Sequence, residues 1–240
     1  MNRLGVVAAL AAEARALGTP VKRIGDVACL GDGTLLAVSG MGGAAATQAA
    51  ARLIEAGAME LMSFGLAGGL DPALAAGSVV VPSEVISPHG DRCPTSEAWR
   101  ERLMAAIASQ GRVAGGSLLT SARTIDRVED KAAAFRETGA VAVDMESLAV
   151  AQIAAVHRLP FAAVRVIVDT AADALPRAVV EASRGGQVRI WRLLGGLALA
   201  PAELAPLMRL AARYRTANRS LAAAARAVLP ARLEAGARVA

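Results

Sequence analysis

The sequence is poor in aromatic residues and in lysine. Phe, Trp and Tyr make up 2% of the 240 residues, and Lys22 and Lys131 are the only lysines. The formal net charge is +5, carried almost entirely by arginine. With so few aromatic side chains to stack on bases, the positive charge does not point to a nucleic-acid partner. We therefore expect no nucleic-acid binding.

Cysteine and histidine are equally scarce. The chain has two cysteines, Cys29 and Cys93, and two histidines. The cysteines lie too far apart in the sequence to form a disulfide framework or a zinc-binding motif, and a zinc site would have to draw on carboxylates. We expect neither a metal nor a cofactor.

Long apolar runs are also missing. No segment approaches the roughly 18 uninterrupted apolar residues of a membrane span, and the N-terminal residues lack a signal-peptide pattern. These absences predict a cytoplasmic location. Hydrophobic residues still make up 55% of the chain, enough for a sizeable core. We predict one domain over residues 1–199 and a helical, basic C-terminal extension over residues 200–240.

Short apolar runs alternate with helix-favouring segments along the first domain. This alternation predicts strands over 4–10, 35–39, 60–64, 78–82, 116–120, 141–143 and 161–168, and helices over 11–17, 44–56, 96–110, 129–137 and 146–157. Glycines follow several of these strands, and the run 65–69 is expected to form a turn. Three further helices are expected over 178–199, 202–216 and 219–229. The fold class is α/β: a three-layer sandwich with a mixed, largely parallel sheet and helices on both faces.

Two acidic residues end apolar, strand-like runs, where an α/β sheet opens its ligand crevice. Asp169 ends the run from Pro160, and Asp144 ends the run Ala142-Val143-Asp144. A carboxyl group in a dry crevice can stay protonated and donate its proton to a leaving group. Asp169 can equally well cap a helix or form a structural pair with Arg165, which lies four residues earlier and therefore on the same strand face.

Glu146 begins the next expected helix, and Asp144 can cap that helix. Taken alone, this is a capping arrangement. In the functional interpretation, Glu146 accepts hydrogen bonds from neighbouring sugar hydroxyls and Met145 supplies an apolar surface under the sugar ring.

Five blocks together resemble the purine nucleoside phosphorylase and nucleosidase superfamily, in order and in approximate spacing. They are Gly5–Glu13, Ser39-Gly40-Met41-Gly42, Gly65-Leu66-Ala67-Gly68-Gly69, Val143-Asp144-Met145-Glu146 and Arg165-Val166-Ile167-Val168-Asp169. The pattern is most similar to the methylthioadenosine/S-adenosylhomocysteine nucleosidases and extends over about residues 5–197. The resemblance implies an N-glycosidase that acts on a small-molecule nucleoside as a homodimer.

The resemblance also implies roles for single residues. Asp169 would protonate the purine at N7, and Glu13 would activate the attacking water, although a glutamate in the first turn of a helix needs no such role. Glu146 would bind the ribose 2′ and 3′ hydroxyls, and Met145 would pack against the ribose. Gly42, Leu66 and Arg165 lie in the matching blocks and complete the expected substrate-binding set.

The choice between hydrolysis and phosphorolysis depends on the nucleophile's ligands. Related phosphorylases carry an arginine and a Ser or Thr in the block before the Gly-Gly pair, where this chain has Ser63-Phe64-Gly65-Leu66. Water is therefore the expected nucleophile, although another arginine could compensate. The chain departs from the nucleosidases at Val168 and Leu66, where that family has serine. Its purine-contacting loop, expected around residues 122–125, is not recognisable residue by residue.

The run over residues 140–147 resembles most the hopanoid-associated branch, in which adenosylhopane is converted to ribosylhopane and adenine. Alternatives are a methylthioadenosine/S-adenosylhomocysteine nucleosidase, a phosphate-dependent phosphorylase, or a nucleoside- or lipid-binding protein on a degenerate enzyme fold. Apolar residues between arginines over 204–226 suggest a basic amphipathic helix that contacts a membrane. Packing of this helix on the core or on a second subunit is the simpler alternative.

Overall fold

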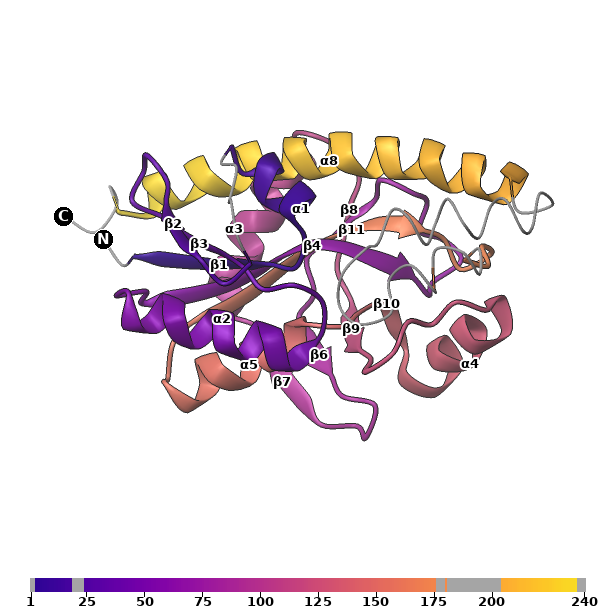
Figure 1. Cartoon of the computed structure of the whole chain (residues 1–240), viewed down its shortest axis with the longest axis horizontal. Coiled ribbons are helices and arrows are strands. Elements are labelled where there is room, and N and C mark those ends of the chain that lie inside the picture. The colour runs from indigo at the N-terminus through magenta and orange to yellow at the C-terminus, as the bar shows by residue number, and fades with distance from the viewer. Residues whose placement is uncertain (1–2, 19–23, 176–179, 181–203, 237–240) are drawn as a thin grey trace.

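The computed structural model describes residues 3–18, 24–175, 180 and 204–236 (Figure 1). Within these ranges, eleven strands form one sheet. The strands are β1 Leu4–Ala8, β2 Val27–Cys29, β3 Leu35–Val38, β4 Glu60–Gly69, β5 Val79–Val80, β6 Glu84–Ile86, β7 Arg92–Pro94, β8 Val113–Ala114, β9 Ser117–Thr120, β10 Ala140–Asp144 and β11 Phe161–Asp169. The helices are α1 Ala11–Ala16, α2 Gly43–Glu55, α3 Glu97–Ala108, α4 Val128–Thr138, α5 Ser147–Val156 and α8 Leu204–Gly236. The helix expected over 178–199 lies outside the described residues except at Val180.

The sheet is mixed and largely parallel, as the sequence predicts. Its main path runs β2-β3-β1-β4-β10-β9-β6-β7, while β11 pairs with β4 and β5, and β8 pairs with β5. Strand β4 is the centre of this arrangement. It runs parallel to β1 and β11 and ends antiparallel to β10. The carboxyl ends of β1, β4 and β11 therefore open in one place, where α/β sheets bind ligands.

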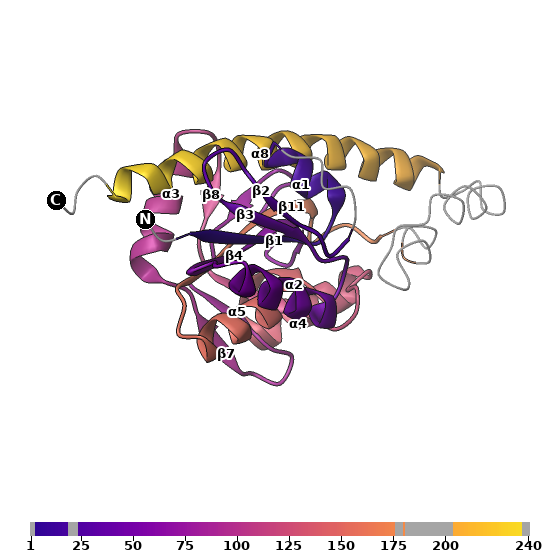
Figure 2. The same ribbon diagram turned by 60° about the vertical axis from the view of Figure 1, so that its left-hand side comes forward.

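Helices cover both faces of the sheet, which confirms the three-layer sandwich (Figures 1 and 2). Alternate residues of a strand face opposite sides, and β11 shows this clearly. Val164 and Val166 pack in the core that α1, α3 and α8 cover, whereas Ala163 and Ile167 pack in the core beneath α2 and α5. Both faces of the central strands are thus buried, as their continuous apolar sequence requires.

Helix α8 runs along one whole face of the molecule (Figure 2). Its residues Ala217, Leu221 and Ala224 are buried in the core shared with α1 and α3. The sequence predicts two helices here, over 202–216 and 219–229, but the structure has one helix without a break between them. The buried Ala217 belongs to the packed face, so the helix continues through this point. None of the helices in the described ranges is both long enough and apolar enough to cross a membrane.

The glycine run 65–69 is not the expected turn. Strand β4 continues to Gly69, because β11 pairs with it over this stretch, Arg165 with Gly65 and Asp169 with Gly68. Glycine favours turns where φ is positive, but Gly65, Gly68 and Gly69 all lack a positive φ. Their small size, not their flexibility, is what the site uses.

Candidate active site

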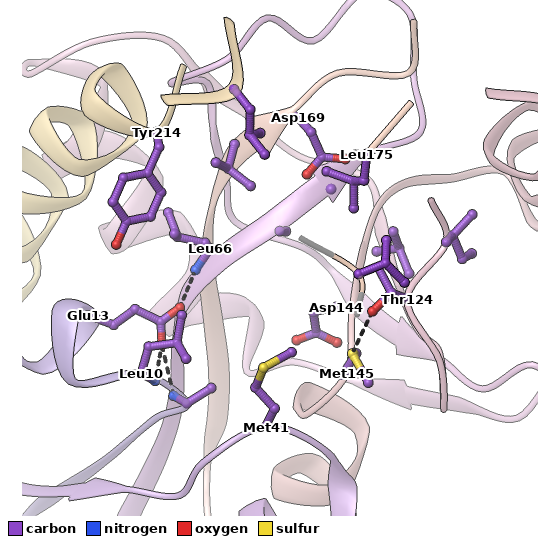
Figure 3. Close-up of a pocket in the computed structure, with 18 of the residues that line it drawn as sticks. Leu10, Glu13, Met41, Leu66, Thr124, Asp144, Met145, Asp169, Leu175 and Tyr214 are labelled. Atoms are coloured by element: carbon purple, nitrogen blue, oxygen red, sulfur yellow. Dashed lines mark hydrogen bonds between the residues drawn. The ribbon is translucent and has the colours of Figure 1, made fainter. Parts of the chain in front are cut away.

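A cavity of about 660 Å³ opens where β1, β4, β10 and β11 end, and α8 closes one side of it (Figure 3). Among the described residues, four carboxylic acids line it, and most of the remaining wall is apolar. The acids are Glu13, Asp144, Glu146 and Asp169. A concave, mainly apolar site with a few converging polar groups is the usual form of a small-molecule site.

Glu13 is held in the cavity wall by the backbone. Its Oε2 accepts hydrogen bonds from the amides of Ala9 (2.8 Å) and Leu10 (2.9 Å), and its Oε1 accepts one from Leu66 (2.8 Å; Figure 3). Burial raises the pKa of Glu13, although Arg165 and these amides oppose the rise. The carboxylate is therefore fixed in position and more basic than usual, which suits a proton acceptor.

Gly65 allows Glu13 and Arg165 to lie close to β4. A Cβ atom at this position would be 2.4 Å from Oε1 of Glu13 and 2.6 Å from Nη1 of Arg165. Only glycine leaves room for both side chains in this arrangement.

Arg165 lies beneath the cavity rather than on its wall. Its Nη2 is 2.6 Å from Oδ2 of Asp144, and the guanidinium also donates to Ser63 Oγ (2.5 Å) and Ser147 Oγ (3.0 Å). The predicted alternative of a pair between Arg165 and Asp169 is wrong. A register shift between Ile167 and Asp169 places a bulge in β11, so the alternation that put both side chains on one face does not hold.

Asp144 is fully engaged in holding the floor of the site. Besides Arg165, it accepts hydrogen bonds from Thr120 Oγ1 (2.7 Å) and from the amide of Ser147 (3.1 Å) at the start of α5. Asp144 thus binds the first amide of α5, although Glu146 occupies the N-cap position, and the same carboxylate also binds the buried arginine. This network joins β9, β10, β11 and α5 below the cavity.

Glu146 faces the cavity and is 6% exposed. Its Oε1 accepts a hydrogen bond from the amide of Gly42 (2.7 Å), which has φ of 96° and precedes α2. Burial and the neighbouring Asp144 raise the pKa of Glu146 to about 7, with Arg165 opposing them. Gly42 thus acts by orienting Glu146.

Asp169 is 5% exposed and forms an ion pair with Lys131 of α4. Burial raises the pKa of Asp169, and the ammonium of Lys131 counteracts part of that rise. Gly68 leaves space beside the acid, since a Cβ there would be 3.3 Å from Oδ2. Sequence reasoning missed Lys131, and its rarity as one of two lysines was the only available signal.

The other walls come from segments far apart in the sequence. Met41 and Met145 lie together at one side, and Thr124 contacts the Met145 sulfur at 3.8 Å (Figure 3). The loop expected to contact the purine does reach the cavity, through Arg123, Thr124 and Ile125. The apolar side is formed by Leu10, Leu66, Val168, Leu175 and Val180 together with Met208, Leu210, Ala211 and Tyr214 of α8.

The structure therefore brings five of the expected site residues to one cavity. These are Glu13, Leu66, Met145, Glu146 and Asp169. Gly42 and Arg165 do not line the cavity. Gly42 binds Glu146 and Arg165 binds Asp144, and both of these acids line it. In the part of the chain that the structure describes, no cluster of His, Cys, Asp and Glu is suited to hold a metal ion.

Comparisons with known proteins agree with this architecture. A family model, the Phosphorylase superfamily, matches residues 5–194. A comparison with curated proteins gives no match. The chain belongs to the Phosphorylase superfamily, which confirms the resemblance drawn from its five sequence blocks.

Solved structures share the fold at low sequence identity. The 5′-methylthioadenosine/S-adenosylhomocysteine nucleosidase of Neisseria meningitidis, solved with methylthio-immucillin-A, is 21% identical with a TM-score of 0.69, over 95% of this chain and 98% of that one. The corresponding Colwellia psychrerythraea nucleosidase, solved with adenine, is 24% identical with a TM-score of 0.61, over 70% and 83%. Futalosine hydrolase of Helicobacter pylori is 19% identical with a TM-score of 0.61, over 70% and 88%.

Proposed function

We propose that the protein hydrolyses the N-glycosidic bond of an adenine nucleoside that carries a large apolar 5′ substituent. The observation that carries this proposal is the composition of the cavity. Glu13, Glu146 and Asp169 share it with an apolar wall that α8 contributes. The acids suit the chemistry of the bond, and the apolar wall suits the substituent.

Breaking the C1′–N9 bond sends its electron pair to the purine and leaves positive charge on the ribose. Asp169, whose pKa is raised by burial, would give a proton to N7 of the leaving base. Glu13 would take a proton from the water that attacks C1′, and Glu146 would bind the ribose hydroxyls. Carboxylates around the sugar stabilise the positively charged transition state.

The surroundings of Ser63 favour water over phosphate as the nucleophile. Ser63 is fully buried, and its hydroxyl is bound to Arg165 and to Ser147 Oγ (3.0 Å). Arg165 and Ser63 therefore bind each other below the cavity and do not line it. Leu66, at the end of the block Ser63-Phe64-Gly65-Leu66, faces the cavity instead. A phosphate needs fixed cationic and hydroxyl donors. Among the described residues, the cationic side chains on the wall that phosphorolysis could use are Arg123 and Arg215.

We propose adenosylhopane as the substrate, with ribosylhopane and adenine as products. The apolar residues of α8 support this choice, as does the resemblance of the run over residues 140–147 to the hopanoid-associated branch. Met208 is especially informative, because it lines the cavity and is 66% exposed. The apolar side of the cavity thus reaches the surface at the start of α8, where a long substituent could extend outward. Methylthioadenosine and S-adenosylhomocysteine are the alternative substrates.

We further propose a cytoplasmic homodimer whose α8 contacts an anionic membrane. Arg209, Arg215, Arg219 and Arg226 are exposed on this helix, and a basic surface beside the opening of the cavity would favour anionic lipids. The homodimer follows from the family resemblance. Binding to vesicles with and without anionic lipid, and light scattering of the free protein, test these two points.

Substrate choice is tested by the kcat/KM for adenine release from a long-chain 5′-alkyl adenosine and from methylthioadenosine, each with and without phosphate. We expect phosphate-independent release that favours the alkyl substrate. Leu210→Asp would place a charge in the apolar wall and lower kcat/KM for the alkyl substrate by about tenfold or more. Ala212→Asp, on the exposed side of α8, is the matched control. A preference for methylthioadenosine, or a strict need for phosphate, would replace the proposed substrate or reaction.

A further inference from the structure

Lys131 contacts the proposed acid from behind the cavity wall. It is fully buried, with 0% exposure, and its ammonium donates to Oδ2 of Asp169 and to the carbonyls of Thr170 (2.9 Å) and Asp173 (2.9 Å). A lysine ammonium has three donors and no acceptor. All three of its N–H groups are therefore used in holding the segment that carries Asp169.

A buried ammonium is costly unless a carboxylate matches its charge. Asp169 is the carboxylate that pairs with Lys131 among the described residues. This arrangement matters for the proton of Asp169, because an oxygen that contacts an ammonium can only accept. Oδ2 is committed to Lys131, so a protonated Asp169 must carry its hydrogen on Oδ1.

We propose that Lys131 is a positioning residue for the reaction: it reserves Oδ2 of Asp169, directs the transferable proton to Oδ1, and stabilises the carboxylate that remains after transfer. This inference rests on the proposed function. In the step itself, the proton on Oδ1 moves to N7 of the purine as the C1′–N9 electron pair passes to the base. The water oxygen bonds to C1′ and its proton goes to Glu13. Solvent returns a proton from Glu13 to Asp169 between turnovers.

Among the charged groups around Asp169, Lys131 has the largest effect on the ionisation of Asp169. From the segment after β11, the Asp173 carboxylate is bound by the amide (3.0 Å) and hydroxyl (2.7 Å) of Thr170 and is paired with Arg213 of α8. Burial opposes ionisation of Asp173, but these partners lower its pKa. Among the described residues, the other ionisable groups that line the cavity form no ion pair with Asp169; they are Glu13, Arg123, Asp144, Glu146, Tyr214 and Arg215.

The test is the pH dependence of kcat in Lys131→Met, which keeps the length of the side chain and removes its charge. The acid must be protonated to act, so activity falls as pH rises through the pKa of Asp169. Removing the ammonium raises that pKa further, and the alkaline limb is expected to move to higher pH. The maximal kcat is expected to fall about tenfold or more, while KM changes little because Lys131 does not touch the cavity.

Two further variants separate positioning from folding. Lys131→Ala leaves a space that a primary alkylamine can enter, and added ethylamine or propylamine is expected to restore kcat and return the alkaline limb toward the wild-type position. Arg136→Met removes an exposed charge from the same helix and is the control. A lower kcat with an unmoved limb and no amine rescue would assign Lys131 a purely structural role and overturn the proposal.

A measurement that needs no turnover keeps this test separate from the proposed function. Infrared difference spectra between wild type and Asp169→Asn report the protonated carboxyl of Asp169 as pH is varied. The same difference in the Lys131→Met background is expected to titrate at higher pH. Equal midpoints in the two backgrounds would overturn the role of Lys131. If the wild type releases no adenine from any substrate, the proposed function fails, and the infrared titration still decides on Lys131.

Discussion

Replacing Glu146 with glutamine is expected to stabilise the folded protein at neutral and alkaline pH. Burial and Asp144 raise the pKa of Glu146 from its usual 4.5 to about 7. The folded chain therefore holds this proton more tightly than the unfolded chain does. The stability from this group is fully present below about pH 4.5, falls as pH rises to about 7, and stays lost above that.

The size of the effect follows from the shift. The pKa of Glu146 rises from 4.5 to about 7, and a difference of one in pKa corresponds to about 1.36 kcal/mol. Ionisation of Glu146 therefore lowers the free energy of unfolding by about 3 kcal/mol. Glutamine is neutral and can still accept the Gly42 hydrogen bond. Glu146→Gln is thus expected to be about 3 kcal/mol more stable than wild type near pH 8 and about equal near pH 4.5.

Urea denaturation of both proteins between about pH 4.5 and 8.5 measures this difference. Glu55→Gln, at an exposed position of α2, is the control and is expected to show no pH-dependent difference from wild type. If the stability difference between Glu146→Gln and wild type does not grow with pH, the raised pKa of Glu146 is wrong. The same variant is expected to lose activity, because proteins often carry destabilising charges where function needs them.

Three further substitutions test the support of the site. Gly65→Ala would push the Glu13 carboxylate out of place and is expected to lower kcat by about tenfold or more, measured in steady state; a fully active variant would contradict the fixed position of Glu13. Arg165→Met leaves Asp144 as an unpaired buried carboxylate and is expected to cost about 3–5 kcal/mol in urea denaturation; a cost below about 1 kcal/mol would refute the network. Arg213→Ala removes a partly exposed ion pair of α8 and is expected to cost no more than about 1 kcal/mol in the same assay; a larger loss would mean that this contact anchors the helix.

The sequence allowed the fold class and the main acids to be predicted because both depend on local signals. Short apolar runs followed by helix formers indicate an α/β sheet, and the blocks around Glu13, Glu146 and Asp169 are recognisable as they stand. The ends of these strands meet at one edge of the sheet, so residues far apart in sequence converge. The structure places these three acids in one cavity accordingly.

Other features depend on contacts that no local pattern reveals. Lys131 reaches Asp169 across 38 positions of the sequence, and its position in α4 looks ordinary. The bulge at Val168 breaks the alternation that predicted a contact between Arg165 and Asp169. The glycines after Phe64 suggest a turn, although they serve close packing within a strand. The side of α8 that lines the cavity likewise depends on how the helix packs against the rest of the protein, which its sequence alone does not show.

We propose that the cavity at the end of β4 cleaves an N-glycosidic bond with water, using Asp169 as the acid. The most direct test is single-turnover cleavage of a long-chain 5′-alkyl adenosine in ¹⁸O-labelled water with phosphate present, using wild type, Asp169→Asn and the exposed-site control Asp26→Asn. We expect wild type and the control to release adenine and a sugar product labelled at C1′, and Asp169→Asn to release neither at a comparable rate. An unlabelled ribose 1-phosphate product, or full activity in Asp169→Asn, would contradict this account.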